Sequence, residues 1–319
     1  MRIAVLPTGR MEWLALPSAL NRLFPGHHFY SLPTQTEVES NKDIEFPVPS
    51  FTSCDVTGLA GRYCAADKLI ERAAGAAIGD RGQDPADLVV ILDDLEIANL
   101  NQPDAVIRIV REAAQRYLGS LAAGIPSKLS ENIRSQHQVR HAEALRERVS
   151  FHLAKPMIEG WLFGDPQGHR RAGAQRSPQL MAATDHECFV TNDTNYDADL
   201  GTQCSRWHAL SEQKKRKCCP AWLKPGIHRQ IHPKAYLSWL CRDDGERTCS
   251  GYVETKGGAA ALAALDWKAL FQSNSHCGFA RAMVHDIAHA LNIRPPFAGL
   301  CSPQTDVGCA PPNRLLRNI

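Results

Sequence analysis

The chain has 319 residues, of which 44% are hydrophobic and 22% are charged, as in a typical folded globular protein and unlike a disordered chain. No stretch approaches the roughly 18 uninterrupted apolar residues of a membrane span, which excludes a transmembrane protein at the level of sequence. Thirty-six basic residues against 34 acidic ones leave a net charge of +2, which indicates no particular class of partner.

The N-terminal apolar run, Ile3–Leu6, is too short for the core of a signal peptide, and no small-residue cleavage site follows it. We therefore predict a cytoplasmic protein. The 11 Cys are scattered and form no Cys-x-x-Cys pair. In a reducing compartment they are expected to be free thiols or metal ligands rather than a disulfide framework.

Apolar strands and amphipathic helices alternate along the chain. In chain order the pattern predicts a strand at 2–6, a helix at 11–24, a strand at 28–32, a long loop at 31–53, a helix at 58–78, a strand at 88–92, a helix at 103–118, a strand at 149–153, a helix opening at 156–163, and later helices at 232–241, 258–270 and 277–291. Strand 88–92 is apolar on both faces, which is typical of a parallel sheet covered by helices on both sides. The predicted fold class is α/β with a mostly parallel sheet.

Composition divides the chain into four parts. We expect an α/β core at 1–165, a basic insertion containing Cys and His at 166–231, a helical part that packs on the core at 232–293, and a Pro-rich tail at 294–319.

Acidic side chains follow three of the predicted strands. They are Glu12 after the first strand, Asp93, Asp94 and Glu96 after strand 88–92, and Glu159 after strand 149–153. Sites in open α/β sheets form at the carboxyl ends of strands, and gathered carboxylates repel unless a cation compensates them. Mg²⁺ or Mn²⁺ would do so and would support phosphodiester cleavage. For any one residue, a helix cap interacting with the macrodipole is the alternative.

Two of these segments resemble a known family. Thr8-Gly9-Arg10-Met11-Glu12 is similar to the Glu-Gly-x-x-Glu motif of TOPRIM domains, which occur in topoisomerases, primases and OLD-family nucleases. Asp94-Leu95-Glu96 is similar to the Asp-x-Asp motif of the same domains. The segments 156–162, 232–234 and 252–257 resemble an uncharacterised bacterial TOPRIM-related family that includes phage-defence proteins, so that the resemblance spans residues 1–292.

The resemblance implies a divalent-metal-dependent nuclease that acts on DNA or RNA in phage defence. It implies metal ligands at Asp93, Asp94, Glu96 and Glu12, and catalytic residues at Glu12, Asp94, Glu159 and Lys256. Beyond nucleic acid, an ATPase or other defence subunit and a second copy of the chain are the partners to consider. Thr8 stands where the family has its leading Glu, which leaves open a noncatalytic subunit that binds nucleic acid or a partner.

A basic segment lies between Arg206 and Lys234. It holds eight Lys or Arg residues against one acid, Glu212, and contains Trp207 and Trp222. Basic side chains neutralise phosphates and Trp stacks on unpaired bases, so the segment predicts a nucleic-acid surface, with a solvated helix face as the alternative. The expected contacts are Lys214, Lys215, Arg216, Lys217, Lys224, Arg229 and Lys234.

A zinc hydrolase is the alternative enzyme hypothesis. His285 and His289 are four residues apart on a predicted helix, as in His-Glu-x-x-His metallopeptidases, although Asp286 replaces the Glu. Cys204 with His208, and His228 with His232, have spacings compatible with Zn²⁺. A helix edge for the two His, and buried thiols for the Cys, are the structural alternatives.

Overall fold

The computed structural model describes residues 1–40, 46–58, 64–80, 83–124, 131–181, 185–201, 211, 221–224, 228–242, 251–272 and 276–319. Within these ranges, no helix has both the length and the apolar character needed to cross a membrane.

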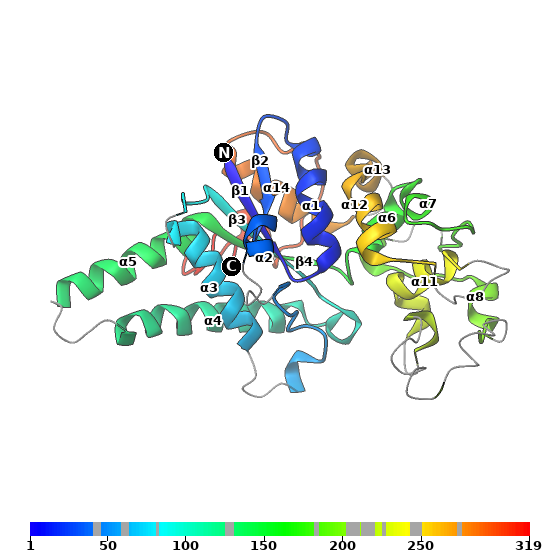
Figure 1. The fold of residues 1–319 in the computed structure, drawn as a ribbon, viewed down its shortest axis with the longest axis horizontal. Coiled ribbons are helices and arrows are strands. Elements are labelled where there is room, and N and C mark those ends of the chain that lie inside the picture. The colour runs from blue at the N-terminus through cyan, green and yellow to red at the C-terminus, as the bar shows by residue number, and fades with distance from the viewer. Residues whose placement is uncertain are drawn as a thin grey trace.

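A sheet of four parallel strands forms the centre of the molecule, in the order β2-β1-β3-β4 (Figure 1). The strands are β1 (Arg2–Pro7), β2 (His28–Ser31), β3 (Leu88–Asp94) and β4 (Val149–Ala154). Every residue of β3 is buried up to Asp93, as expected for a parallel strand covered on both faces. The predicted α/β fold class is confirmed, and the four strands fall where the apolar runs predicted them.

Helices surround the sheet. They are α1 (Arg10–Leu23), α2 (Gln35–Ser40), α3 (Cys64–Ile78), α4 (Pro103–Gly124), α5 (Glu131–Arg148), α6 (Glu159–Gly164), α7 (Gly168–Arg171), α8 (Thr194–Ala198), α11 (Pro233–Leu240), α12 (Ala259–Ala263), α13 (Trp267–Gln272) and α14 (Gly278–Ala290). Short 3₁₀ turns are η1 (Val56–Gly58), η3 (Ile97–Asn99), η4 (His186–Cys188), η5 (Ala221–Leu223), η6 (Arg229–Ile231) and η8 (Val307–Cys309), and η7 (Glu254–Gly258) is a π-helical turn.

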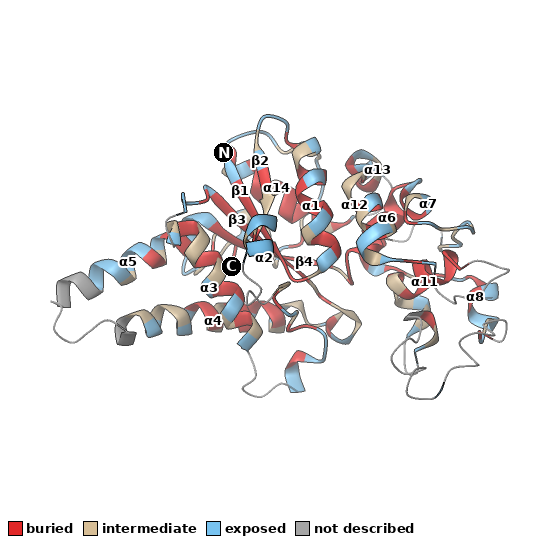
Figure 2. Cartoon of the chain, viewed as in Figure 1, coloured by how far each residue is buried: buried red, intermediate tan, exposed pale blue. Residues whose placement is uncertain are grey.

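Two hydrophobic cores cover the two faces of the sheet. Ile3 and Val5 belong to a core that also includes residues of α1, α6, α11 and α14, whereas Ala4 and Leu6 belong to one that includes residues of α3 and α4. This division follows from the strand period of two, which sends alternate side chains to opposite faces. Figure 2 shows the buried strands between the helices.

Several elements differ from the sequence prediction. The predicted helix 258–270 is divided into α12 and α13, because the Asp266 carboxylate accepts a hydrogen bond from the Ala269 N–H (3.0 Å) and begins a new helix. The predicted helix opening at Pro156 begins instead at Glu159, after a turn that contains the cis Lys155–Pro156 bond. The predicted loop 31–53 contains α2, where Thr34 and Glu37 exchange capping hydrogen bonds.

The C-terminal segment belongs to the fold. As predicted for residues 294–319, it has no helix beyond η8, but Leu316 and Ile319 are buried against the α3–α4 face of the sheet. The Asn318 side chain forms two hydrogen bonds with the backbone of Phe151 on β4, accepting from its N–H (3.0 Å) and donating to its C=O (2.7 Å). The expected tail therefore completes the edge of the sheet.

Candidate functional site: a carboxylate cluster at the sheet edge

The carboxyl ends of β1, β3 and β4 lie at one edge of the sheet, and acidic side chains gather there. Glu12 lies in the first turn of α1, Asp94 ends β3, and Glu159 begins α6 after β4. The charges of Glu12, Glu159 and Glu96 each raise the pKa of Asp94, in addition to the effect of burial. The structure therefore brings together four of the acidic residues that the sequence singled out.

Glu12 is a deeply buried member of this carboxylate cluster. Its side chain is 4% exposed, and Oε2 has no hydrogen-bond partner among the described residues. Burial, followed by the charge of Glu159, raises its pKa to about 8. Gly9 allows this placement, because a Cβ at that position would overlap the Glu12 carboxylate.

Asp94 and Glu159 are anchored by the turn that follows β4 and by a buried tyrosine. Asp94 Oδ1 accepts a hydrogen bond from the Ile158 N–H (2.9 Å), and Glu159 Oε1 accepts one from the Tyr252 hydroxyl (3.3 Å). Burial is the largest cause of the raised pKa of both carboxyl groups. Among the described residues, neither carboxylate forms an ion pair with a cation that is buried as deeply as Glu159.

Glu96 has a strained backbone, with φ 62° and ψ 158°, a region that residues with a side chain rarely adopt. Its N–H donates to the Pro156 carbonyl (2.7 Å), which holds the strained residue beside the turn after β4. Burial raises the pKa of Glu96 to about 7. Strain of this kind is concentrated at functional sites.

The carboxylate of Asp93 accepts hydrogen bonds from threonine hydroxyl groups. It is 1% exposed and accepts hydrogen bonds from Thr8 Oγ1 and from Thr52 Oγ1, the latter at 3.2 Å. Burial raises its pKa to about 6, and the hydroxyl groups act in the opposite direction. Thr8, which stands in the place of the family's leading Glu, is therefore the direct partner of Asp93.

Two residues of the cluster were assigned differently or missed in the sequence. The Lys234 ammonium lies 2.6 Å from Glu254 Oε2 and 3.7 Å from Glu159 Oε1. Although burial lowers it, the pKa of Lys234 is raised above its ordinary value by Glu159 and Glu254. From the sequence, Lys234 is expected on the nucleic-acid surface and, like Lys256, is also a candidate for a lysine beside the metal centre that binds the scissile phosphate, whereas Glu254 is not selected.

Lys256, the lysine predicted to be catalytic, lies in η7 two residues beyond Glu254. Its side chain is exposed, and no carboxylate in the described ranges forms an ion pair with it. The lysine that contacts the cluster is Lys234. The difference arises because η7 turns Glu254 inward and leaves Lys256 toward solvent.

The oxygen donors of the cluster are of the kind that Mg²⁺ and Mn²⁺ prefer. In the part of the chain that the structure describes, however, no three His, Cys, Asp or Glu side chains are arranged to hold a metal ion. The cluster is assembled around the ammonium group of Lys234 instead. The oxygen donors and the unpartnered Glu12 Oε2 are chemically suited to a divalent cation. In this structure, however, the positive charge at the cluster is the single charge of the Lys234 ammonium group.

Most of the basic segment, including Lys214, Lys215, Arg216 and Lys217, lies outside the described residues. Lys224 is exposed. Arg229 donates to the carbonyls of Tyr196 and of Asp199 (3.0 Å), so its guanidinium contributes to the fold. The expectation that Trp222 stacks on bases is wrong, because its ring is fully buried beneath Arg229 and Arg242.

Three of the residues considered for zinc, His232, His285 and His289, have other partners within the protein. Cys204, His208, Cys218 and Cys219 lie outside the described residues. His232 Nδ1 accepts from the Ala235 N–H (3.3 Å) and caps α11, and burial lowers its pKa to about 4. His285 lies 2.9 Å from the Phe297 carbonyl, and Arg317 donates to His289 Nδ1 (3.0 Å). The two imidazoles of α14 therefore have separate structural partners.

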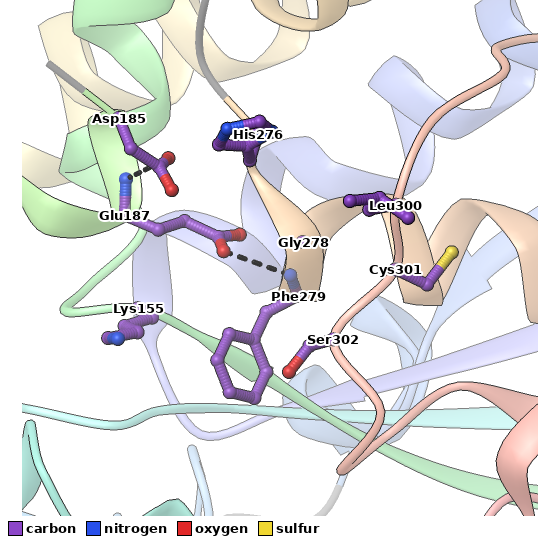
Figure 3. A pocket seen from close by; sticks show the side chains of 9 residues that line it. All are labelled: Lys155, Asp185, Glu187, His276, Gly278, Phe279, Leu300, Cys301 and Ser302. Carbon is purple, nitrogen blue, oxygen red and sulfur yellow. Dashed lines mark hydrogen bonds between the residues drawn. The ribbon is translucent and has the colours of Figure 1, made fainter.

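A pocket of about 260 Å³ lies beside the start of α14 (Figure 3). Its polar groups are largely bonded within the protein: Glu187 accepts from the N–H groups of Phe279 (2.9 Å) and Ala280 (2.8 Å). The Cys301 sulfur points away from Glu187 and lies 3.1 Å from His285 Nδ1. The pocket thus contains a carboxyl group that is already bonded to the N-terminus of α14, and burial raises its pKa to about 8.

No family model, no curated protein and no solved structure matches this chain. The resemblance to TOPRIM proteins therefore stays a prediction, and the residues of the carboxylate cluster carry the functional argument.

Proposed function

We propose that the chain is a divalent-metal-dependent nuclease of the TOPRIM type, with the carboxylate cluster as its metal centre. The observation that carries this proposal is an excess of carboxylates at the carboxyl edge of a parallel sheet, with Glu12 and Glu159 deeply buried and Asp94, Glu96 and Glu254 partly buried. In the described part of the chain, one ammonium group, that of Lys234, contacts Glu254 and Glu159 and interacts electrostatically with Glu12, Asp94 and Glu96. Such an excess is costly for a fold and useful for a site that binds a cation.

Asp94, Glu96, Glu12 and Glu159 would hold Mg²⁺ or Mn²⁺. The bound cation would supply an activated water and stabilise charge on the phosphate. Tyr252 orients Glu159 through its hydrogen bond, and the turn after β4 orients Asp94. Glu12, with a pKa of about 8 and an unpartnered Oε2, is suited to hold or accept a proton near neutral pH.

The charge of the basic segment supports nucleic acid as the substrate. Of the eight Lys or Arg residues between Arg206 and Lys234, Arg229 and Lys234 have partners within the protein, and the other six would neutralise several phosphates. This support comes from the sequence, and among the segment's described residues Lys224 is the exposed base. The role in phage defence follows from the resemblance alone.

A noncatalytic subunit that binds nucleic acid is the second candidate. One observation favours it: Thr8 replaces the family's leading Glu and donates a hydrogen bond to Asp93. A carboxylate that accepts two hydroxyl hydrogen bonds is less available as a metal ligand than a free one. In this case the carboxylate cluster would keep the geometry of a nuclease site but would not catalyse cleavage.

A cleavage assay separates the two candidates. Purified protein is incubated with plasmid, single-stranded DNA and transfer RNA in the presence of Mg²⁺, Mn²⁺ or EDTA. We expect metal-dependent cleavage that Asp94→Asn reduces at least about 100-fold, since a metal contributes several kcal/mol to such a reaction. Asp84→Asn, the same chemical change at a carboxylate that is 89% exposed, is the matched control.

Cleavage that survives EDTA or Asp94→Asn would contradict the metal centre. Salt-sensitive binding of nucleic acid without any cleavage would favour the noncatalytic subunit.

A further inference from the structure

Lys234 and the carboxylate cluster differ in how deeply they are held. The side chains of Lys234 and Glu254 are 36% and 33% exposed, whereas that of Glu159 is 2% exposed. Glu12 is equally deep, at 4%. The ammonium group therefore enters the cluster from the solvent side, and it can leave without unfolding the residues around it.

The position of Lys234 is unfavourable apart from these carboxylates. It is the second residue of α11, where the positive end of the helix dipole disfavours a cation. The rest of the helix, from Ala235 to Leu240, is buried and fixes the backbone of Lys234. A rigid helix thus presents a flexible cationic side chain to the cluster.

Breaking the contact between Lys234 and Glu254 costs little free energy, because each side chain is about one-third exposed and water solvates both groups when they separate. The longer contact with Glu159 (3.7 Å) costs more, since Glu159 is 2% exposed, and the arriving divalent cation would replace the lost positive charge. A divalent cation among the deeper carboxylates would bring two positive charges to the same region. Ammonium and metal would then repel each other, so the two are alternatives rather than companions.

We propose that Lys234 is a built-in cation that occupies the carboxylate cluster in the absence of metal, and that binding of a divalent cation displaces its ammonium group toward solvent. This inference rests on the proposed metal centre and adds its regulation. It also explains why the cluster contains many carboxylate oxygens although, among the described residues, no three acidic, His or Cys side chains are arranged to hold a metal ion.

The first test measures Mn²⁺ affinity by calorimetry on the full chain. Lys234→Met keeps the length of the side chain and removes the charge, so the competing cation is lost. We expect Mn²⁺ affinity to rise at least about tenfold, because a positive charge a few ångströms away is removed. Lys268→Met removes the same charge from an exposed position on α13 and should leave the affinity unchanged.

The second test needs no substitution. Lysines of the wild-type protein are acylated with a small amine-reactive ester, and peptide mass spectrometry gives the rate at each site. Without metal, the Lys234 ammonium is paired with Glu254 and should react slowly. Saturating Mn²⁺ should raise its rate several-fold relative to that of Lys268.

Each outcome decides the matter. If the wild type and Lys234→Met bind Mn²⁺ equally, or the variant binds more weakly, Lys234 is not a competitor and the inference is overturned while the metal centre stands. If neither protein binds Mn²⁺, the proposed metal centre itself fails. Unchanged Lys234 acylation in Mn²⁺-saturated protein would also overturn the inference.

Discussion

Two buried polar regions of this molecule treat their charges in opposite ways. Near the C-terminus, Asp286 is fully buried but lies 3.2 Å from His152 and 3.0 Å from Arg317. Although burial acts to raise it, the pKa of Asp286 is lowered by these partners. In the carboxylate cluster, by contrast, the pKa values of Glu12 and Asp94 are raised.

The difference separates a region that stabilises the fold from one that is ready to bind. A buried charge with partners on two sides fixes the elements that carry it, here β4, α14 and the C-terminal segment. Buried charges of one sign, held close by a rigid sheet edge, store unfavourable free energy that a cationic ligand can release.

The largest expected effect comes from breaking the paired region. Asp286→Asn leaves Arg317 and His152 without their carboxylate and should lower the free energy of unfolding by about 3–5 kcal/mol. Urea denaturation measures the change. Asp84→Asn, at an exposed ion pair, should change the stability by less than about 1 kcal/mol. A loss at Asp286 no larger than that of the control would contradict the assigned role.

The pH dependence of stability tests the unpaired region. Because the folded-state pKa of Glu12 is about 8, against an ordinary 4.5, the folded protein binds the extra proton. The stabilising contribution is complete below pH 4.5 and is lost as the pH rises through 8. The metal-free protein should therefore lose stability between pH 5 and pH 8, and Glu12→Gln should reduce this loss by roughly 3 kcal/mol.

Thermal unfolding at several pH values, in the presence of EDTA, provides the measurement. Parallel curves for wild type and Glu12→Gln would show that Glu12 does not carry the raised pKa.

Asp93 is intermediate between the two regions, because it is buried with a raised pKa but accepts hydrogen bonds from hydroxyl groups. Removing one of these hydroxyl groups tests their contribution. Thr8→Val keeps the shape of the side chain and deletes the donor to Asp93, so the pKa of Asp93 should rise further. A lost hydrogen bond to a charged group costs about 1.5–3 kcal/mol, and we expect a loss of about 2 kcal/mol at pH 8. The loss should be smaller at pH 5, where Asp93 is protonated; equal losses at both pH values would argue against an ionised acceptor.

The smallest effect is expected at the strained residue. Glu96→Gly relieves a backbone with φ 62° and should stabilise the metal-free protein by about 1 kcal/mol. The same change should weaken Mn²⁺ binding if the Glu96 carboxylate is a ligand. Glu147→Gly, at an unstrained helical position, should destabilise the protein and serves as the comparison for denaturation and calorimetry.

Local sequence patterns were sufficient to predict the strands of the sheet and some members of the carboxylate cluster. The strands are continuous apolar runs, and residues that follow neighbouring parallel strands must meet at one edge, which is why Glu12, Asp94 and Glu159 were predicted together. Helix α5 escaped prediction because its sequence has no apolar stripe and its pattern gives no helical period.

Lys234 and Glu254 join the cluster through tertiary packing alone. They are more than 70 residues beyond Glu159 in the chain, on the helical part that packs against α1 and α6. The sequence contains one local sign for Lys234, its place at the start of a helix, where the dipole disfavours a cation, but no sign of which carboxylates it contacts. Tertiary packing also decides the position of Trp222, whose burial depends on the packing of Arg229 and Arg242 over its ring.

The hydrogen bonds of Asn318 have a consequence for how this protein behaves in concentrated solution. Strand β4 lies at one side of the sheet, where free backbone groups would be a template for a strand from another molecule. The Asn318 amide occupies both groups of Phe151, and the Arg317 N–H occupies the Val149 carbonyl (2.8 Å). Arg317 and Asn318 thus protect the edge of β4 from pairing with a strand of another molecule, and their removal would expose backbone groups that favour aggregation.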